Sequence, residues 1–132
     1  MRIGEVAAHA GVNIDTVRFY ERKGILPKPR REIPSGYRMY SEDTPRRIRF
    51  VKRAQVLGFT LKEIRELLSL RARPGARCAD VLSRARTKIR DVDEKVRALE
   101  AIRRALSKLA SECSGRGEVS ECPILDALEE EE

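Results

Sequence analysis

The sequence has few of the residues that build catalytic centres and disulfide frameworks. Among its 132 residues there is no tryptophan, one histidine and three cysteines. Because an odd number of cysteines cannot pair completely within one chain, we expect free thiols and a reducing, cytoplasmic location. No histidine or carboxylate is spaced to activate a cysteine nucleophile, so the sequence indicates neither an enzyme nor catalytic residues.

Long apolar runs are also missing. No stretch approaches the roughly 18 consecutive apolar residues of a membrane span, and the N-terminus lacks the pattern of a signal peptide. We therefore expect a soluble protein with no membrane partner. The length fits one domain, or one small domain with an extension.

Glycine and proline are absent from residues 76–114, which predicts one long helix. Apolar residues recur there at spacings of three and four, interrupted by Arg103, on an otherwise charged helix. A helix with one narrow apolar stripe needs a partner. Because the chain has no second long helix, the simplest closed arrangement is a homodimer through a twofold antiparallel coiled coil. This apolar stripe consists of Leu82, Ala85, Ile89, Val92, Val96, Leu99, Leu106, Ala110 and Cys113.

Positive charge is concentrated in the first part of the chain. Residues 1–77 hold 18 Lys and Arg against 8 Asp and Glu, whereas residues 78–132 hold 10 against 13. A basic front part and a mildly acidic back part favour a polyanion-binding module joined to a second function. A basic surface that only solubilises the protein is the alternative.

Residues 3–24 have the pattern of two short helices around a glycine turn. The first helix ends at Gly11, and the second is capped by Asn13 or Asp15, runs through Tyr20 and ends at Gly24. Such a pair is typical of a helix-turn-helix, which by itself is weak evidence for DNA binding.

The following segment, KPRREIPSGYRMYS, predicts a hairpin with a Pro-Ser-Gly turn at residues 34–36. Its second strand is aromatic and basic, as expected for a wing beside the helix pair. Arg38 is the favoured DNA contact on this strand, and Arg18 on the second helix can bind a phosphate or a guanine edge. The three tyrosines, Tyr20, Tyr37 and Tyr40, fit a core position and a DNA contact equally well.

Two further helices are predicted before a linker at residues 71–77. Pro45 stands in the first turn of one, and Thr60 with Glu63 forms a capping box for the next. The predicted buried faces are Ile48, Val51, Ala54 and Leu57 on the first, and Ile64, Leu67 and Leu68 on the second. The first also carries a basic face that can bind a DNA backbone, with Arg46, Arg47, Arg49, Lys52 and Arg53.

The three cysteines stand at the two ends of the long helix. Residues 80–111 as a helix span roughly 48 Å at ~1.5 Å per residue, whereas thiolate–metal bonds measure only ~2.3 Å. One chain with an intact helix therefore cannot bring Cys78 and Cys113 to one ion, but an antiparallel twin can, with Cys122 folding back from the loop. The prediction is a three-thiolate site for a soft metal, shared between subunits. Redox sensing and simple packing of the cysteines are the alternatives.

The segments VNIDTVRFYERKGIL, SGYRMYSED and RFVKRAQVLGFTLKEI, followed by the long helix, resemble the MerR family of transcriptional regulators over almost the whole chain. The resemblance implies winged helix-turn-helix heads joined by an antiparallel coiled coil. It also implies binding to operator DNA and a partnership with RNA polymerase. Members of this family repress without effector and activate with it by distorting the promoter.

The cysteine separations of 35 and 9 residues are similar to those of the mercury-responsive members of the family. The resemblance implies Hg(II) as the effector, with no organic cofactor. Lead and cadmium sensors use a very similar trio, so Pb(II) and Cd(II) remain alternatives. Zn(II) fits less well, because Ser114 stands where zinc sensors carry a second cysteine and the loop has no histidine.

The sequence thus predicts a mainly α protein in four parts. These are a winged helix-turn-helix DNA-binding domain at residues 1–70, a hinge at 71–79, a dimerisation helix at 80–112, and a metal-binding loop with the C-terminal tail at 113–132. The predicted metal ligands are Cys78, Cys113 and Cys122. The predicted DNA-binding residues are Thr16, Val17, Arg18, Tyr20, Lys23, Tyr37, Arg38 and Tyr40.

Overall fold

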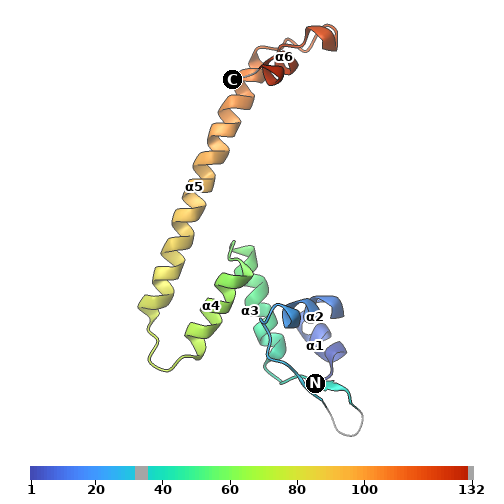
Figure 1. Ribbon diagram of the computed structural model, residues 1–132, viewed down its shortest axis with the longest axis vertical. Coiled ribbons are helices and arrows are strands. Elements are labelled where there is room, and N and C mark those ends of the chain that lie inside the picture. Colours follow the sequence, from blue (N-terminus) through green and yellow to red (C-terminus); the bar gives the residue numbers. More distant parts are fainter. Residues whose placement is uncertain (32–35, 131–132) are drawn as a thin grey trace. The chain divides into compact units, whose positions relative to one another are not determined.

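A computed structural model describes residues 1–31 and 36–130 of the chain (Figure 1). The chain forms two compact units, Met1–Ala85 and Arg86–Glu132. Helices dominate both units, and the described residues contain one small antiparallel sheet. The prediction of a mainly α protein with a winged helix pair and a long C-terminal helix is confirmed.

The first unit begins with the predicted helix pair, α1 (Ile3–Ala10) and α2 (Ile14–Arg22). Gly11 ends α1 with a left-handed backbone (φ 70°), which glycine adopts without the steric cost of a side chain. Asn13, rather than Asp15, caps α2, because its side-chain oxygen accepts the Thr16 N–H at 2.8 Å. The turn between the two helices therefore follows from local chemistry.

The wing consists of strands β1 (Arg30–Arg31) and β2 (Arg38–Met39), which pair antiparallel with Arg30 opposite Met39. The predicted turn at residues 34–36 lies mostly outside the described residues. The N-terminus holds the end of the wing in place. The ammonium of Met1 donates to the carbonyl of Tyr40 at 2.8 Å, and the Tyr40 N–H donates to the carbonyl of Met1 at 2.6 Å.

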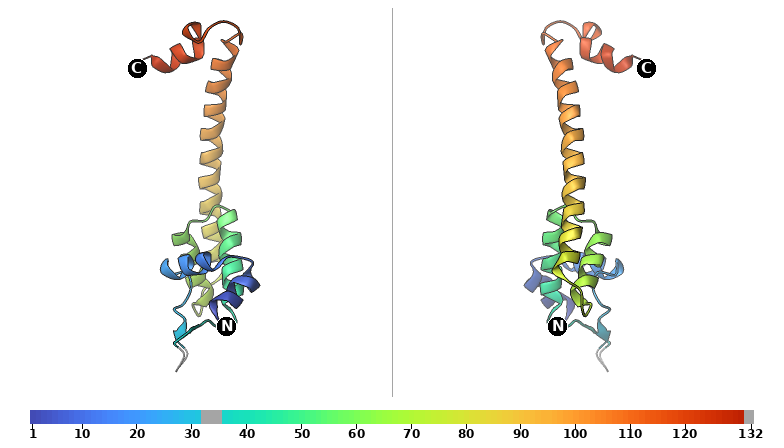
Figure 2. Two further views of the ribbon diagram at one scale, coloured as in Figure 1. Left: turned by 90° about the vertical axis from the view of Figure 1, so that its right-hand side faces the viewer. Right: turned by 90° about the vertical axis from the view of Figure 1, so that its left-hand side faces the viewer.

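Helices α3 (Thr44–Val56) and α4 (Leu61–Ala72) complete the head. Figure 2 shows α1 to α4 from two further sides, gathered around a common core. Leu57, predicted to be buried, is 67% exposed. The prediction is wrong because α3 ends at Val56, so the helical spacing no longer directs Leu57 inward, and Phe59 and Leu61 pack against the core instead. Among the described residues, the largest fully buried side chains are Val6, Val17, Ile25, Ile48, Val51 and Ile64.

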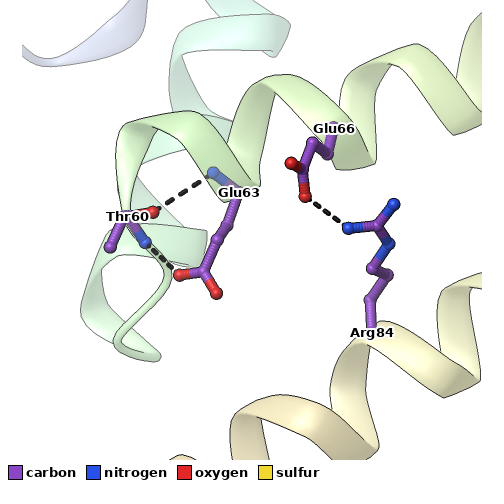
Figure 3. A network of polar contacts seen from close by, with 4 residues as sticks. All are labelled: Thr60, Glu63, Glu66 and Arg84. Carbon is purple, nitrogen blue, oxygen red and sulfur yellow. Dashed lines mark hydrogen bonds and ion pairs between the residues drawn. The ribbon is translucent and has the colours of Figure 1, made fainter.

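The capping box of α4 is present as predicted (Figure 3). The hydroxyl of Thr60 accepts the Glu63 N–H at 3.2 Å, and the carboxylate of Glu63 accepts the Thr60 N–H at 2.8 Å. One turn further along α4, Glu66 forms an ion pair with Arg84 of the next helix. This pair ties α4 to the beginning of α5 within the first unit.

Helix α5 (Cys78–Ser111) is unbroken over 34 residues. It begins at Cys78 rather than at residue 80, and α4 continues to Ala72, so the connection between them is shorter than predicted and covers residues 73–77. The large members of the apolar stripe, from Leu82 to Leu106, are exposed in the single chain. Within the described part of the chain, no helix is both long enough and apolar enough to cross a membrane.

The segment after α5 contains structure that the sequence reading did not predict. A short 3₁₀ helix, η1 (Val119–Glu121), is followed by α6 (Pro123–Glu129), which Figure 2 shows turning away from the axis of α5 within the second unit. Pro123 at the start of α6 is compatible with a helix because the first turn needs no N–H donor there. The predicted tail of glutamates lies partly outside the described residues.

The capping box yields a stability prediction. Replacement of Thr60 by alanine removes the acceptor for the Glu63 N–H, so we expect the free energy of unfolding to fall by about 1 kcal/mol. Chemical denaturation followed by circular dichroism at one fixed protein concentration measures this change. Thr60→Ser keeps the hydroxyl and is expected to unfold like the parent protein; equal stability of the alanine variant would contradict the role of the cap.

Candidate nucleic-acid interface and metal ligands

A cleft of ≈ 1180 Å³ opens on the head between the start of α1, the exposed side of α2 and the wing. Its lining is strongly basic, with two carboxylates, Glu5 and Glu21, among the cations. Such a surface attracts the phosphates of a nucleic acid and releases their counterions. The cations that line the cleft are Arg2, Arg18, Arg22, Lys28, Arg31 and Arg38.

The structure brings three of the predicted DNA-binding residues together in this cleft, namely Arg18, Tyr37 and Arg38. Tyr37 is 56% exposed, and the guanidinium of Arg2 stacks 4.2 Å above its ring. Thr16 and Lys23 do not line the cleft. Thr16 donates its hydroxyl to the Asn13 side chain, and Lys23 is exposed with its ammonium 5.7 Å from the Phe19 ring.

Three other predicted contacts belong to the hydrophobic core. Val17 is 0% exposed, so its side chain does not reach the surface, and its assignment as a DNA contact is corrected to packing of α2. Tyr20 and Tyr40 are each 4% exposed. Of the two roles that the sequence allowed, a core position and a DNA contact, both residues therefore adopt the core position. The DNA contacts assigned to Tyr20 and Tyr40 stay predictions.

The hydroxyls of the two buried tyrosines have partners inside the head. Tyr20 donates to the side-chain oxygen of Gln55 at 2.8 Å, and Tyr40 donates to the carboxylate of Glu21 at 2.7 Å. Burial raises the pKa of Tyr20 above its ordinary value. Burial is also the main cause that raises the pKa of Tyr40, and the neighbouring Glu21 carboxylate adds to it. Both hydroxyls therefore stay protonated and able to donate at neutral pH.

Part of the basic lining is not among the DNA-binding residues predicted from the sequence. Lys28 and Arg31 stand in the segment KPRR, whose run of cations beside a predicted turn was an available signal. Arg2 had no such signal, because its partner Tyr37 is distant in sequence and only the folded chain joins them. Arg22 also lines the cleft but is not among the DNA-binding residues predicted from the sequence.

The basic face predicted on α3 is partly used inside the head. Arg47 donates to the carbonyl of Ile25 at 2.9 Å, and Arg49 donates to the carbonyl of His9 at 3.0 Å. These contacts tie α3 to the segments that end α1 and follow α2. The two arginines therefore have a structural role, whereas Arg46, Lys52 and Arg53 on the same helix remain exposed.

The three cysteines are free thiols. Cys78 is exposed at the first position of α5, Cys113 is half-buried just after its last turn, and Cys122 is half-buried between η1 and α6. Local hydrogen bonds fix the two later positions, since the Cys113 N–H donates to the Ala110 carbonyl and the Cys122 N–H to the Val119 carbonyl. In residues 1–31 and 36–130 of one chain, no three His, Cys, Asp or Glu side chains cluster as metal ligands.

The chain matches two family models along most of its length. The model described as MerR HTH family regulatory protein matches residues 1–70, and the model described as MerR, DNA binding, matches residues 46–109. A mercuric resistance operon regulatory protein from Bacillus cereus is 45% identical over 127 residues, which cover 96% of this chain and 96% of the relative.

Solved structures are also similar. The transcription regulator PbrR691 from Ralstonia metallidurans CH34, in complex with lead(II), superposes with a TM-score of 0.88 at 39% identity and covers 97% of this chain and 98% of its own. MerR from Bacillus megaterium MB1, in complex with mercury(II), gives a TM-score of 0.72 at 42% identity. The match covers 98% of this chain and 100% of the chain of that structure. These matches span both the winged head and the long helix, and the chain therefore belongs to the MerR family of helix-turn-helix transcriptional regulators.

Proposed function

We propose that this protein is a metal-responsive regulator that binds operator DNA as a homodimer and switches from repression to activation when a soft metal, foremost Hg(II), binds Cys78, Cys113 and Cys122. The observation that carries the proposal is the position of three free thiols at the two ends of one unbroken helix. Three thiolates form a donor set that suits soft metal ions, so the residues present fit the effector.

The length of α5 supports a site shared between two subunits. Its 34 residues span about 51 Å at ~1.5 Å per residue, whereas a thiolate bonds a metal ion at roughly 2.3 Å. The two ends of one intact helix therefore cannot meet at one ion. In an antiparallel pair, Cys78 of one subunit lies at the same end as Cys113 and Cys122 of the partner subunit.

The exposed apolar stripe on α5 supports the homodimer. Leu82, Ile89, Val92, Val96, Leu99 and Leu106 are all exposed in the single chain. Their removal from water would contribute roughly 25 cal/mol per Å² of apolar surface. A second copy of α5 offers an identical stripe, and a twofold axis lets each stripe cover the other.

The hinge, residues 73–77, provides a route from the metal to the DNA-binding heads. Glycine at position 75 adopts φ 81° within it. On its α5 side, the Asp80 carboxylate accepts the Arg77 N–H at 3.0 Å, and the Glu66–Arg84 ion pair ties α4 to the next turn (Figure 3). A metal that pulls on Cys78 therefore acts on a residue directly beside the connection to the head.

The proposed switch acts by DNA deformation. A shift of the hinge repositions the two heads, and the bound promoter then bends and untwists so that RNA polymerase engages it. The energy of that deformation depends on the DNA sequence, including base pairs that the protein does not touch. The metal shifts the balance only if it binds the activating state more tightly than the repressing state.

Substitution of one thiol separates metal sensing from DNA binding. We expect Cys113→Ser to abolish metal-dependent transcription from the target promoter and to leave the affinity for its operator unchanged, because the cleft on the head is distant in sequence from the loop. Ser114→Ala, a neighbouring change that keeps all three thiols, serves as the matched control and should induce normally. Metal induction that survives in Cys113→Ser would refute the three-thiolate site.

Mixed dimers test whether the site is shared. A dimer of one Cys78→Ser subunit and one Cys113→Ser subunit retains one complete site if the thiols come from both chains, and none if each chain forms its own. We expect this heterodimer to bind one metal ion, as measured by native mass spectrometry, whereas each parent homodimer loses tight binding. The matched control is a dimer of one Cys113→Ser subunit and one Cys122→Ser subunit. In a shared arrangement this dimer has no complete site.

A panel of ions identifies the effector. We expect Hg(II) to give a stoichiometric complex with sulfur-to-metal charge-transfer absorption in competition with a small thiol, and to induce transcription at lower concentration than Pb(II), Cd(II) or Zn(II). Relatives named for mercuric resistance support this order, and the lead(II) complex of PbrR691 makes Pb(II) the main alternative. Oxidation of Cys113 or Cys122 without a stoichiometric metal complex would instead favour a thiol redox switch.

A further inference from the structure

Glu21 is an acidic residue in the middle of a basic surface. It stands on α2 and lines the cleft together with six lysines and arginines. Its side chain is 14% exposed. A carboxylate at a surface that receives phosphates repels them, so its presence at this position calls for a compensating role.

The carboxylate of Glu21 holds the wing with both of its oxygens. Oε1 accepts a hydrogen bond from Nη1 of Arg38 at 2.9 Å, and Oε2 accepts one from the hydroxyl of Tyr40 at 2.7 Å. Arg38 belongs to β2, and Tyr40 follows it directly. Bonds to an ionised group are stronger than neutral ones, and two of them fix direction as well as distance. One side chain of α2 thus sets where β2 lies.

The geometry around Glu21 leaves Arg38 available for a ligand. A guanidinium has five N–H donors, of which the bond to Glu21 uses one, and the side chain of Arg38 is 47% exposed. Arg18, one turn before Glu21 on α2, is exposed in the same cleft. The first turns of a second helix in a helix-turn-helix contact base edges, so the spacing between α2 and the wing decides which groove positions both arginines reach.

We propose that Glu21 is a positioning residue that sets the register between α2 and the wing and thereby raises the preference of the protein for its operator over other DNA. Glu21 weakens the attraction to any phosphate backbone, and it strengthens binding only where Arg18 and Arg38 meet their correct partners. Both effects increase specificity, the first by lowering background affinity and the second by ordering the contacts.

The proposal predicts opposite changes for two kinds of DNA. The probes are the best duplex that the unaltered full-length protein selects from a random-sequence pool, and a scrambled duplex of the same length and composition. For Glu21→Gln we expect the Kd for the selected duplex to rise roughly tenfold, because two charge-assisted bonds weaken. The Kd for the scrambled duplex should fall by a few fold, because one negative charge is gone. Fluorescence anisotropy at two salt concentrations measures both values.

Glu5→Gln is the matched control for charge. Glu5 also lines the cleft, but its carboxylate accepts a hydrogen bond from the backbone N–H of Arg2 at 3.4 Å, and Arg2 does not belong to β2. We expect this variant to bind both duplexes more tightly by a similar factor, so that their ratio stays constant. If Glu21→Gln also tightened binding to both duplexes by a similar factor, Glu21 would act only through its charge, and the proposal would fail.

A second variant keeps the proposal testable if Glu21→Gln folds poorly. Tyr40→Phe removes one of the two wing contacts and leaves the charge of Glu21 in place. We expect binding to the selected duplex to weaken more than binding to the scrambled one, so that the ratio of the two affinities falls. Equal losses on both duplexes in either variant would indicate general damage to the head and would overturn the positioning role, as would an unchanged Tyr40→Phe.

Discussion

The rigidity of one long helix is the constraint on which the rest of the protein depends. Helix α5 holds 34 residues without glycine or proline, so it lacks the two residue types that most weaken the interior of a helix. The helix keeps Cys78 apart from Cys113 and leaves an apolar stripe in water. The homodimer proposed above would account for both features, because a twofold axis would cover the stripe and bring the separated thiols together.

Charge is distributed unevenly between the head and the rest of the chain. The head carries the excess of arginine and lysine, whereas the chain from Cys78 onward is mildly acidic. The basic cleft lies on the head, where one hydrophobic core joins α1 to α4, and two of the three proposed metal ligands, Cys113 and Cys122, lie after the last turn of α5. The hinge between α4 and α5 is five residues long and is bracketed by Asp80 and by the Glu66–Arg84 pair. A short, bracketed connection transmits a displacement better than a free linker would.

Local signals in the sequence predicted the fold well, and contacts between distant segments decided what they missed. The helix caps join residues within one turn, so their roles could be predicted from the sequence. This holds for Asn13 and for the pair Thr60 and Glu63. The burial of Tyr20 and Tyr40 depends on Gln55 and Glu21, which stand 35 and 19 positions away. Helical spacing alone likewise placed Leu57 inside, although α3 stops one residue earlier. The three-thiolate site stays a prediction, since among the described residues of a single chain no three His, Cys, Asp or Glu side chains cluster as metal ligands.

The net charge of such a head is a poor measure of its affinity for DNA. Arg47 and Arg49 contribute to the total, yet each donates to a backbone carbonyl inside the head. Arg38 is partly neutralised by Glu21, and Arg2 stacks on Tyr37. The number of phosphates actually neutralised appears in the dependence of affinity on salt, with a slope of about −0.9 per phosphate on duplex DNA. A cation that already has a partner within the protein adds less to that slope than its formal charge suggests.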